Sequence, residues 1–247
     1  MNSPQPVKKT IKLKNSVRIV TATSLFDGHD AAINIMRRIM QSQGAEVIHL
    51  GHDRSVEEIV NVAIQEDAQS IAVSSYQGGH MEFFRYMLDL LREKGSGHIQ
   101  VFAGGGGVII QSEIQELTDY GICRVYSPED GRELGLTGMI ADMLKRSDFQ
   151  VLPDKFEHHA DKLVTENVQH IANSLTWIEQ NVKGSQLAPE NKVVEPQEAV
   201  QKVLNKLHSQ DSPVENSQAP VIGLTGTGGA GKSCLADELV RSFLEEF

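Results

Sequence analysis

This sequence of 247 residues has little cysteine, few aromatic residues (5%) and no long apolar run. Its two cysteines, Cys123 and Cys234, lie far apart without a C-x-x-C pattern. That spacing excludes a cysteine-based zinc cluster and is typical of reduced, structural thiols. No stretch is long and apolar enough to cross a bilayer, and residues 1–15 lack the apolar core of a signal peptide. We therefore expect a cytoplasmic protein that does not bind a membrane.

Basic residues are also scarce. Lysine and arginine number 23 against 33 aspartates and glutamates, which gives a net charge of −10. Such a chain lacks the basic surface that nucleic-acid binding requires, so we expect no nucleic-acid partner. With 40% hydrophobic residues, the chain is long enough for one large domain or two small ones, each with a buried core.

From residue 16 to about residue 146, short β-branched runs alternate with amphipathic stretches. Parallel strands need long crossover connections, so this alternation predicts an α/β fold with a parallel sheet between layers of helices. We expect a flavodoxin-like (Rossmann-type) domain of five strands in the order 2-1-3-4-5. The predicted strands are residues 17–21, 46–50, 70–74, 99–103 and 122–126.

Two helix starts are predicted from capping boxes, Ser55 with Glu58 and Ser112 with Gln115. Apolar residues at spacings of three and four predict two further buried helix faces. These residues are Ile33, Met36 and Met40, and then Met81, Phe84, Leu88 and Leu91.

Residues 148–220 break this alternation and predict a helical linker. An apolar stripe from Val164 to Val182 predicts one helix, and Pro196 fits the first turn of a second helix. The stripe needs a partner surface, so we expect the linker to pack between domains. Its histidines have no neighbouring ligand pattern and are expected to be solvated. They are His158, His159 and His170.

A second domain is predicted to begin at Val221, where a strand runs into a complete Walker A pattern. Its backbone N–H groups are expected to surround nucleotide phosphates, with Lys232 on the terminal phosphates and Ser233 on Mg²⁺. Only 14 residues follow Ser233, so we expect the front of a longer protein that binds nucleotide poorly by itself. The predicted nucleotide-binding residues are Gly226, Gly228, Gly229, Ala230, Gly231, Lys232 and Ser233.

A separate candidate site lies in the first domain, where polar and small residues follow three predicted strands. Ligands of open parallel sheets bind outside the carboxyl ends of the strands, where the strand order reverses. His29, with a carboxylate two residues earlier, suits a metal ligand whose ring is oriented by that acid. One histidine is too few for zinc, and it suffices only for a metal that brings its other ligands in a tetrapyrrole-like ring. The candidate residues are Asp27, Gly28, His29, Ser74, Tyr76, Gly106 and Gly107.

This pattern resembles the D-x-H-x-x-G, S-x-L and G-G signature of cobalamin-binding domains. The resemblance covers residues 16 to 146 and implies that His29 replaces the base of the cofactor as the lower cobalt ligand, with Asp27 bonded to His29. It also implies that Ser74 bonds the displaced base and that Gly106 and Gly107 line its slot.

Two residues depart from that signature. Ala32 stands where glycine is usual and Tyr76 where leucine is usual, and both reshape the wall past which the cofactor tail runs. Neither substitution removes the predicted cobalt ligand.

A cobalamin domain, a helical linker and a P-loop domain in this order resemble the family of fused isobutyryl-CoA mutases. The resemblance implies an adenosylcobalamin-dependent isomerase that interconverts isobutyryl-CoA and n-butyryl-CoA, with a GTPase chaperone domain that uses GTP and Mg²⁺. We expect a homodimeric parent protein that binds acyl-CoA through a barrel absent from this chain, and no catalytic residues or turnover here. The expected divisions are a tail (1–15), a cobalamin-binding domain (16–147), a linker (148–220) and the start of the GTPase domain (221–247).

Three alternatives remain at this point. A corrinoid carrier for methyl transfer would use the same aspartate and histidine, but the P-loop and the short segment 1–15 disfavour it. A methylmalonyl-CoA mutase-like protein would carry its cobalamin domain at the carboxyl end. A flavodoxin-like signalling or flavin-binding module fused to an ATPase would leave His29 as a surface residue.

Overall fold

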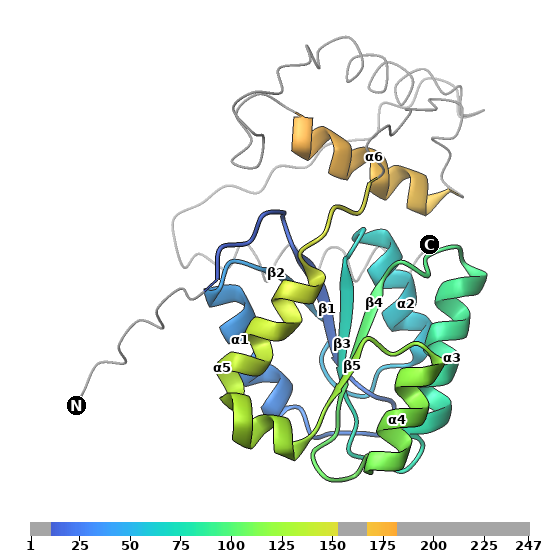
Figure 1. Cartoon of the computed structure of the whole chain (residues 1–247). Helices are drawn as coiled ribbons and strands as arrows, with labels where there is room; N and C mark the ends of the chain where they lie inside the picture. The colour runs from blue at the N-terminus through green and yellow to red at the C-terminus, as the bar shows by residue number, and fades with distance from the viewer. Residues whose placement is uncertain (1–10, 153–166, 182–247) are drawn as a thin grey trace, which may run out of the picture. The chain divides into compact units, whose positions relative to one another are not determined.

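The computed structural model describes residues 11–152 and 167–181, and all of them lie in the first of two compact units, residues 1–207 (Figure 1). The predictions for the Walker A loop at residues 226–233, for the rest of residues 182–247 and for residues 153–166 lie outside the described residues. No helix in the described ranges combines the length and apolarity that crossing a bilayer requires.

Five parallel strands form one sheet in the order β2-β1-β3-β4-β5, which confirms the predicted topology. Each predicted strand agrees with the observed one to within two residues at either end. The strands are β1 (Arg18–Thr23), β2 (Glu46–His49), β3 (Ser70–Ser74), β4 (Gln100–Gly104) and β5 (Arg124–Tyr126).

Helices cover both faces of this sheet (Figure 1). On one face, α1 (Ala31–Ser42) and α5 (Pro128–Ser147) enclose a core that includes Met40, Phe102 and Leu144. On the other face, α2 (Val56–Gln65), α3 (His80–Glu93) and α4 (Gln111–Tyr120) enclose a larger core that includes Ile59 and Phe84. Both faces of the sheet are therefore buried, as the apolar strands require.

One of the two predicted helix starts is confirmed and the other is wrong. Ser55 and Glu58 form the capping box of α2, in which each side chain accepts the backbone N–H of the other. Helix α4 begins two residues earlier than expected, so Ser112 lies inside its first turn and cannot cap it. Instead, the Glu113 carboxylate accepts the N–H of Ile110 at 3.0 Å.

The helix predicted from Val164 to Val182 is confirmed in part by α6 (Val168–Asn181). This helix packs on α2, and among residues 168–177, whose side chains are described, the buried ones are Ala172, Ser174 and Thr176. Two residues of the predicted apolar stripe, Val168 and Leu175, are 38% and 57% exposed. The small residues face inward because the packed side approaches the start of β1, where Arg18 donates to the Thr176 hydroxyl at 3.1 Å. His170, predicted to be solvated, is half-buried.

The residues just before β1 are packed against the sheet domain. Ile11 and Leu13 contact the core under α1 and α5. The N–H groups of Lys14 and Asn15 donate to the carboxylate of Asp148 at 2.8 and 2.9 Å. This part of the segment expected to be a tail therefore joins the beginning of the domain to the end of α5.

Cys123 is a free, half-buried thiol, which agrees with its predicted structural role. Burial raises the pKa of this thiol, because the charged form loses solvation. It is therefore largely protonated and a poor nucleophile at neutral pH.

Candidate functional site

The carboxyl ends of β1, β3 and β4 lie side by side, so the loops that follow them meet at one edge of the sheet. The Ser24 N–H donates to the Ser74 carbonyl at 3.0 Å, and the Ser75 N–H donates to the Gly104 carbonyl at 2.7 Å. The hydroxyls of Ser24 and Ser75 are also hydrogen-bonded, at 2.9 Å, and both serines are fully buried. The sheet thus brings the three predicted loops together.

Asp27 and His29 form a close pair in the loop after β1. Asp27 Oδ1 accepts the His29 backbone N–H at 2.9 Å and is 2.7 Å from His29 Nδ1. The Asp27 side chain is buried, at 1% exposure, whereas the His29 side chain is 76% exposed. Because a carboxylate only accepts hydrogen bonds, Nδ1 carries the proton in the neutral form of the ring, and in that form the lone pair is on Nε2.

Electrostatics favour the charged form of Asp27. Burial raises the pKa of its carboxyl, but hydrogen bonds from the N–H groups of Tyr76 and His29 and from the imidazole outweigh burial. The pKa of Asp27 consequently lies below its usual value. A carboxylate held in this way orients the histidine ring and raises the basicity of Nε2, which improves a metal ligand.

Tyr76 connects this pair to the loop after β4. Its backbone N–H donates to Asp27 Oδ2 at 2.5 Å, and its ring centroid is 5.5 Å from that of His29. The same ring covers Gly106, where a Cβ would lie 2.9 Å from Tyr76 Cε1. Gly106 has a φ of +57°, which also favours glycine.

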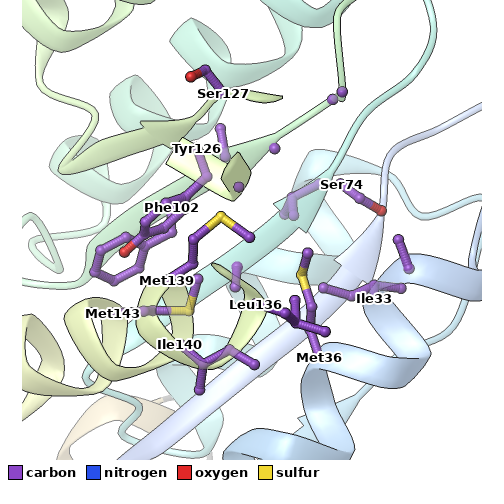
Figure 2. A pocket seen from close by; sticks show the side chains of 18 of the residues that line it. Ile33, Met36, Ser74, Phe102, Tyr126, Ser127, Leu136, Met139, Ile140 and Met143 are labelled. Carbon is purple, nitrogen blue, oxygen red and sulfur yellow. The ribbon is translucent and has the colours of Figure 1, made fainter. Parts of the chain in front are cut away.

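A cavity of about 210 Å³ opens beside Tyr76, between the sheet and helices α1 and α5 (Figure 2). Four residues singled out in the sequence line it: Ala32, Ser74, Tyr76 and Gly106. Pockets that enclose a whole small ligand usually measure ~300–1,000 Å³. This cavity is smaller, so it fits one part of a larger ligand.

Most of the lining was missed by sequence reasoning, because its residues follow the same apolar spacing as ordinary core residues. Met36, Met139 and Met143 give this wall flexible thioether side chains that adapt to an inserted group (Figure 2). The main missed residues are Ile33, Met36, Phe102, Tyr126, Leu136, Met139, Ile140 and Met143.

Ser74 and Gly105 line the cavity, whereas Gly28 and Gly107 do not. The Ser74 hydroxyl is 3.3 Å from the hydroxyl of Thr23 and can still accept or donate a further hydrogen bond. Gly105 is required by packing, since a Cβ there would lie 2.2 Å from the Ser75 carbonyl oxygen. Gly28 and Gly107 lie outside the cavity lining, and a Cβ at either position would meet no atom within 4 Å.

The site as a whole fits a cobalamin cofactor. An exposed imidazole with a free Nε2 and a buried carboxylate behind it offers one strong axial ligand. The neighbouring cavity is too small for a corrin ring, and its lining is mostly apolar with the Ser74 hydroxyl on its wall, which suits an aromatic base on a tail.

Comparisons with known proteins agree with this fit. Residues 17–126 match the family of the B12 binding domain. The chain is 58% identical over 236 residues to the fused isobutyryl-CoA mutase of Geobacillus kaustophilus, a match that covers 94% of this chain and 20% of that protein. It is 54% identical over 229 residues to the fused isobutyryl-CoA mutase of Cupriavidus metallidurans, covering 93% of this chain and 19% of that protein.

A shorter relative is matched over most of its own length. The pivalyl-CoA mutase small subunit of Xanthobacter autotrophicus is 30% identical over 117 residues, which cover 47% of this chain and 77% of that subunit. The chain spans about a fifth of the length of the fused mutases that it matches. The matched domain and these identities show that the chain belongs to the B12-binding acyl-CoA mutase family, which includes the fused isobutyryl-CoA mutases.

Proposed function

We propose that this chain binds cobalamin in the base-off form, with Nε2 of His29 as the lower axial ligand of cobalt. The observation that carries the proposal is the hydrogen bond of 2.7 Å between the buried Asp27 carboxylate and Nδ1 of the exposed His29 ring. That bond fixes the tautomer and leaves Nε2 free to bind a metal. One protein ligand suffices because the corrin ring would itself supply the other nitrogen ligands of the cobalt.

The cavity beside Tyr76 is the proposed place for the displaced base and its nucleotide tail. Ser74 would donate a hydrogen bond to the base from the cavity wall, and Gly106 would leave room for the tail beside the Tyr76 ring. Gly28 and Gly107 lie outside the cavity, so their proposed contacts are with parts of the cofactor that remain outside it.

For the whole protein we propose an adenosylcobalamin-dependent mutase that interconverts isobutyryl-CoA and n-butyryl-CoA. When bound, adenosylcobalamin supplies the radical chemistry of the rearrangement. Residues 16–147 hold the cofactor, and residues 148–220 link this domain to a GTPase domain that begins at residue 221. There, Lys232 would bind the GTP phosphates and Ser233 the Mg²⁺. The identity to two fused mutases over more than nine-tenths of the chain supports this assignment.

The cofactor proposal is tested by electron paramagnetic resonance of the chain reconstituted with Co(II) cobalamin. Protein labelled with ¹⁵N-histidine is expected to change the nitrogen splitting from triplets to doublets, and His29→Ala is expected to lose that change. His52→Ala is the control, because His52 is an exposed histidine in the neighbouring loop after β2. If the splitting of the wild-type chain does not respond to the ¹⁵N label, another group binds cobalt. The same conclusion follows if the response to the label persists in His29→Ala.

A further inference from the structure

The loop that carries Asp27 is attached on its outer side to the loop after β2. The Thr23 N–H donates to the Gly51 carbonyl at 2.9 Å, and the Arg54 N–H donates to the Thr23 carbonyl at 3.1 Å. Beyond these backbone bonds, Asp53 Oδ1 accepts the N–H of Phe26 at 2.7 Å. A side chain from the β2 loop therefore holds the residue that directly precedes Asp27.

Phe26 has an unusual conformation for a large residue. Its φ is +63°, and its side chain projects into solvent with 84% exposure. A left-handed conformation is unfavourable for a residue with a Cβ, and an exposed ring recovers little of that cost by burial. The hydrogen bond to Asp53 is the observed interaction that offsets the strain. Asp53 is itself left-handed, with φ +58°, a conformation that aspartate and asparagine adopt more readily.

The conformation of Phe26 decides how the chain enters the cofactor site. Asp27 follows at once, its N–H donates to the Ser24 carbonyl at 3.1 Å, and its carboxylate turns back to His29. If Phe26 left the left-handed region, the chain direction would change immediately before Asp27. The bonds from Asp27 to His29 and to Tyr76 would then be misaligned.

We propose that Asp53 is a positioning residue for cofactor binding, which fixes the backbone of Phe26 and thereby the direction in which His29 presents Nε2. The proposal rests on the proposed function, since it concerns the same histidine. Asp53 lies 24 positions after His29 in the sequence, outside the signature that identifies the site. Its effect passes through one hydrogen bond and three residues of backbone.

Two substitutions separate the hydrogen bond from the other properties of Asp53. Asp53→Asn keeps an acceptor oxygen and tolerates the left-handed conformation, whereas Asp53→Gly keeps that conformation but has no acceptor. Both remove the same negative charge, so any difference between them reports the hydrogen bond. Asp53 is exposed, so both variants are expected to keep the wild-type circular dichroism spectrum and melting temperature to within a few degrees.

The experiment measures the dissociation constant of cobalamin by visible absorption for the wild-type chain and both variants. Residues that orient a metal ligand change affinity by ~10–100-fold when removed. We expect Asp53→Gly to weaken binding roughly 10-fold, near the lower end of that range, and Asp53→Asn to stay within about twofold. The second readout is the fraction of bound Co(II) cobalamin that shows the ¹⁵N-histidine splitting. This fraction is expected to be smaller than in the wild-type chain in Asp53→Gly but not in Asp53→Asn.

Each outcome decides the question. Wild-type affinity and splitting in Asp53→Gly would overturn the role of Asp53 while leaving His29 as the ligand. Equal losses in Asp53→Asn and Asp53→Gly would overturn it as well, because they would trace the effect to charge. A wild-type chain whose splitting ignores the histidine label would overturn the proposed function, and this inference with it.

Discussion

Asp27 joins two loops of the site through one buried carboxylate, so its removal affects both the fold and the cofactor. Asp27→Ala leaves the N–H groups of Tyr76 and His29 without their acceptor. Hydrogen bonds to a charged group contribute ~1.5–3 kcal/mol, so we expect a loss of about 2 kcal/mol, or roughly 4–8 °C in melting temperature. Calorimetry of the chain without cofactor measures this loss.

The matched control is Asp30→Ala, which is expected to cost less stability, since the Asp30 carboxylate makes no side-chain cap bond to α1 and accepts one side-chain N–H, from Asn34 at 3.1 Å. Cobalamin affinity is expected to fall ~10–100-fold in Asp27→Ala, because the imidazole is no longer oriented. Equal melting temperatures for the two variants would contradict the role assigned to the Asp27 carboxylate.

Gly106 and Tyr76 are expected to be energetically coupled. In Gly106→Ala, the new methyl group lies too close to the Tyr76 ring and the left-handed backbone at φ +57° becomes strained. Tyr76→Leu removes the ring but leaves the backbone strain, so it should relieve only part of the cost. A double-mutant cycle in urea is expected to give a coupling of ~0.5–3 kcal/mol.

The informative result is whether the costs of the two substitutions are additive. The Tyr76 backbone N–H still reaches Asp27 in Tyr76→Leu, so that single variant should retain cobalamin binding. Additive costs in the cycle would show that the ring moves away from residue 106 without a penalty.

At the scale of helices and strands, periodicity was enough to predict the sheet and its order, because crossover connections leave few alternatives. The start of α4 could not be read in the same way. Ser112 and Gln115 fit a capping pattern, but Glu113 satisfies the N–H of Ile110 and moves the start back. Competing caps two residues apart are decided by tertiary packing, which a local pattern does not contain.

Part of the candidate site could likewise be predicted from the sequence and part could not. The sequence predicted that Asp27, His29, Ser74 and Tyr76 gather at the carboxyl ends of the strands, and the structure brings them together there. The cavity walls on α1 and α5 could not, because Met36 and Met139 satisfy the same apolar spacing whether a helix packs tightly or leaves a void. Asp53 gave no sequence signal, because its role depends on contact with another loop.

Helix α5 forms one cavity wall, and its first turn is expected to make its stability depend on pH. Burial raises the pKa of Asp130, but hydrogen bonds from Ser127 and the ion pair with Arg124 outweigh it, so the pKa lies below its usual value. The folded state then binds fewer protons than the unfolded state. The stabilisation is present above the unfolded pKa of ~3.9 and is lost as pH falls through the folded pKa.

Asp130→Ala is therefore expected to cost ~1 kcal/mol at pH 7, the usual contribution of a helix cap, and less at pH 3. Urea unfolding at the two pH values measures the difference. Glu129→Ala, in the same turn but with a side chain 65% exposed, is the control and should cost little at either pH. A cost for Asp130→Ala that grows in acid would reverse the assigned direction.

On the scale of the whole described domain, the candidate cofactor site and the contact with α6 lie at opposite ends of the strands. The cofactor site lies where the strands end, whereas α6 docks where they begin, through Thr176 on Arg18 of β1. Six residues of β1 at ~3.3 Å each span roughly 20 Å. Docking of α6 and cofactor binding should consequently be independent in this chain.

Ala172→Glu tests that independence, because Ala172 is buried at 4% exposure in the α6 interface and cannot accommodate a charged side chain there. We expect residues 168–181 to lose protection from hydrogen exchange while cobalamin affinity stays within about twofold, since additivity holds for sites more than ~7–10 Å apart. Leu175→Glu places the same charge on the exposed side of the helix, at 57% exposure, and should change neither quantity. A weaker cobalamin affinity in Ala172→Glu alone would mean that the sheet transmits the state of α6 to His29.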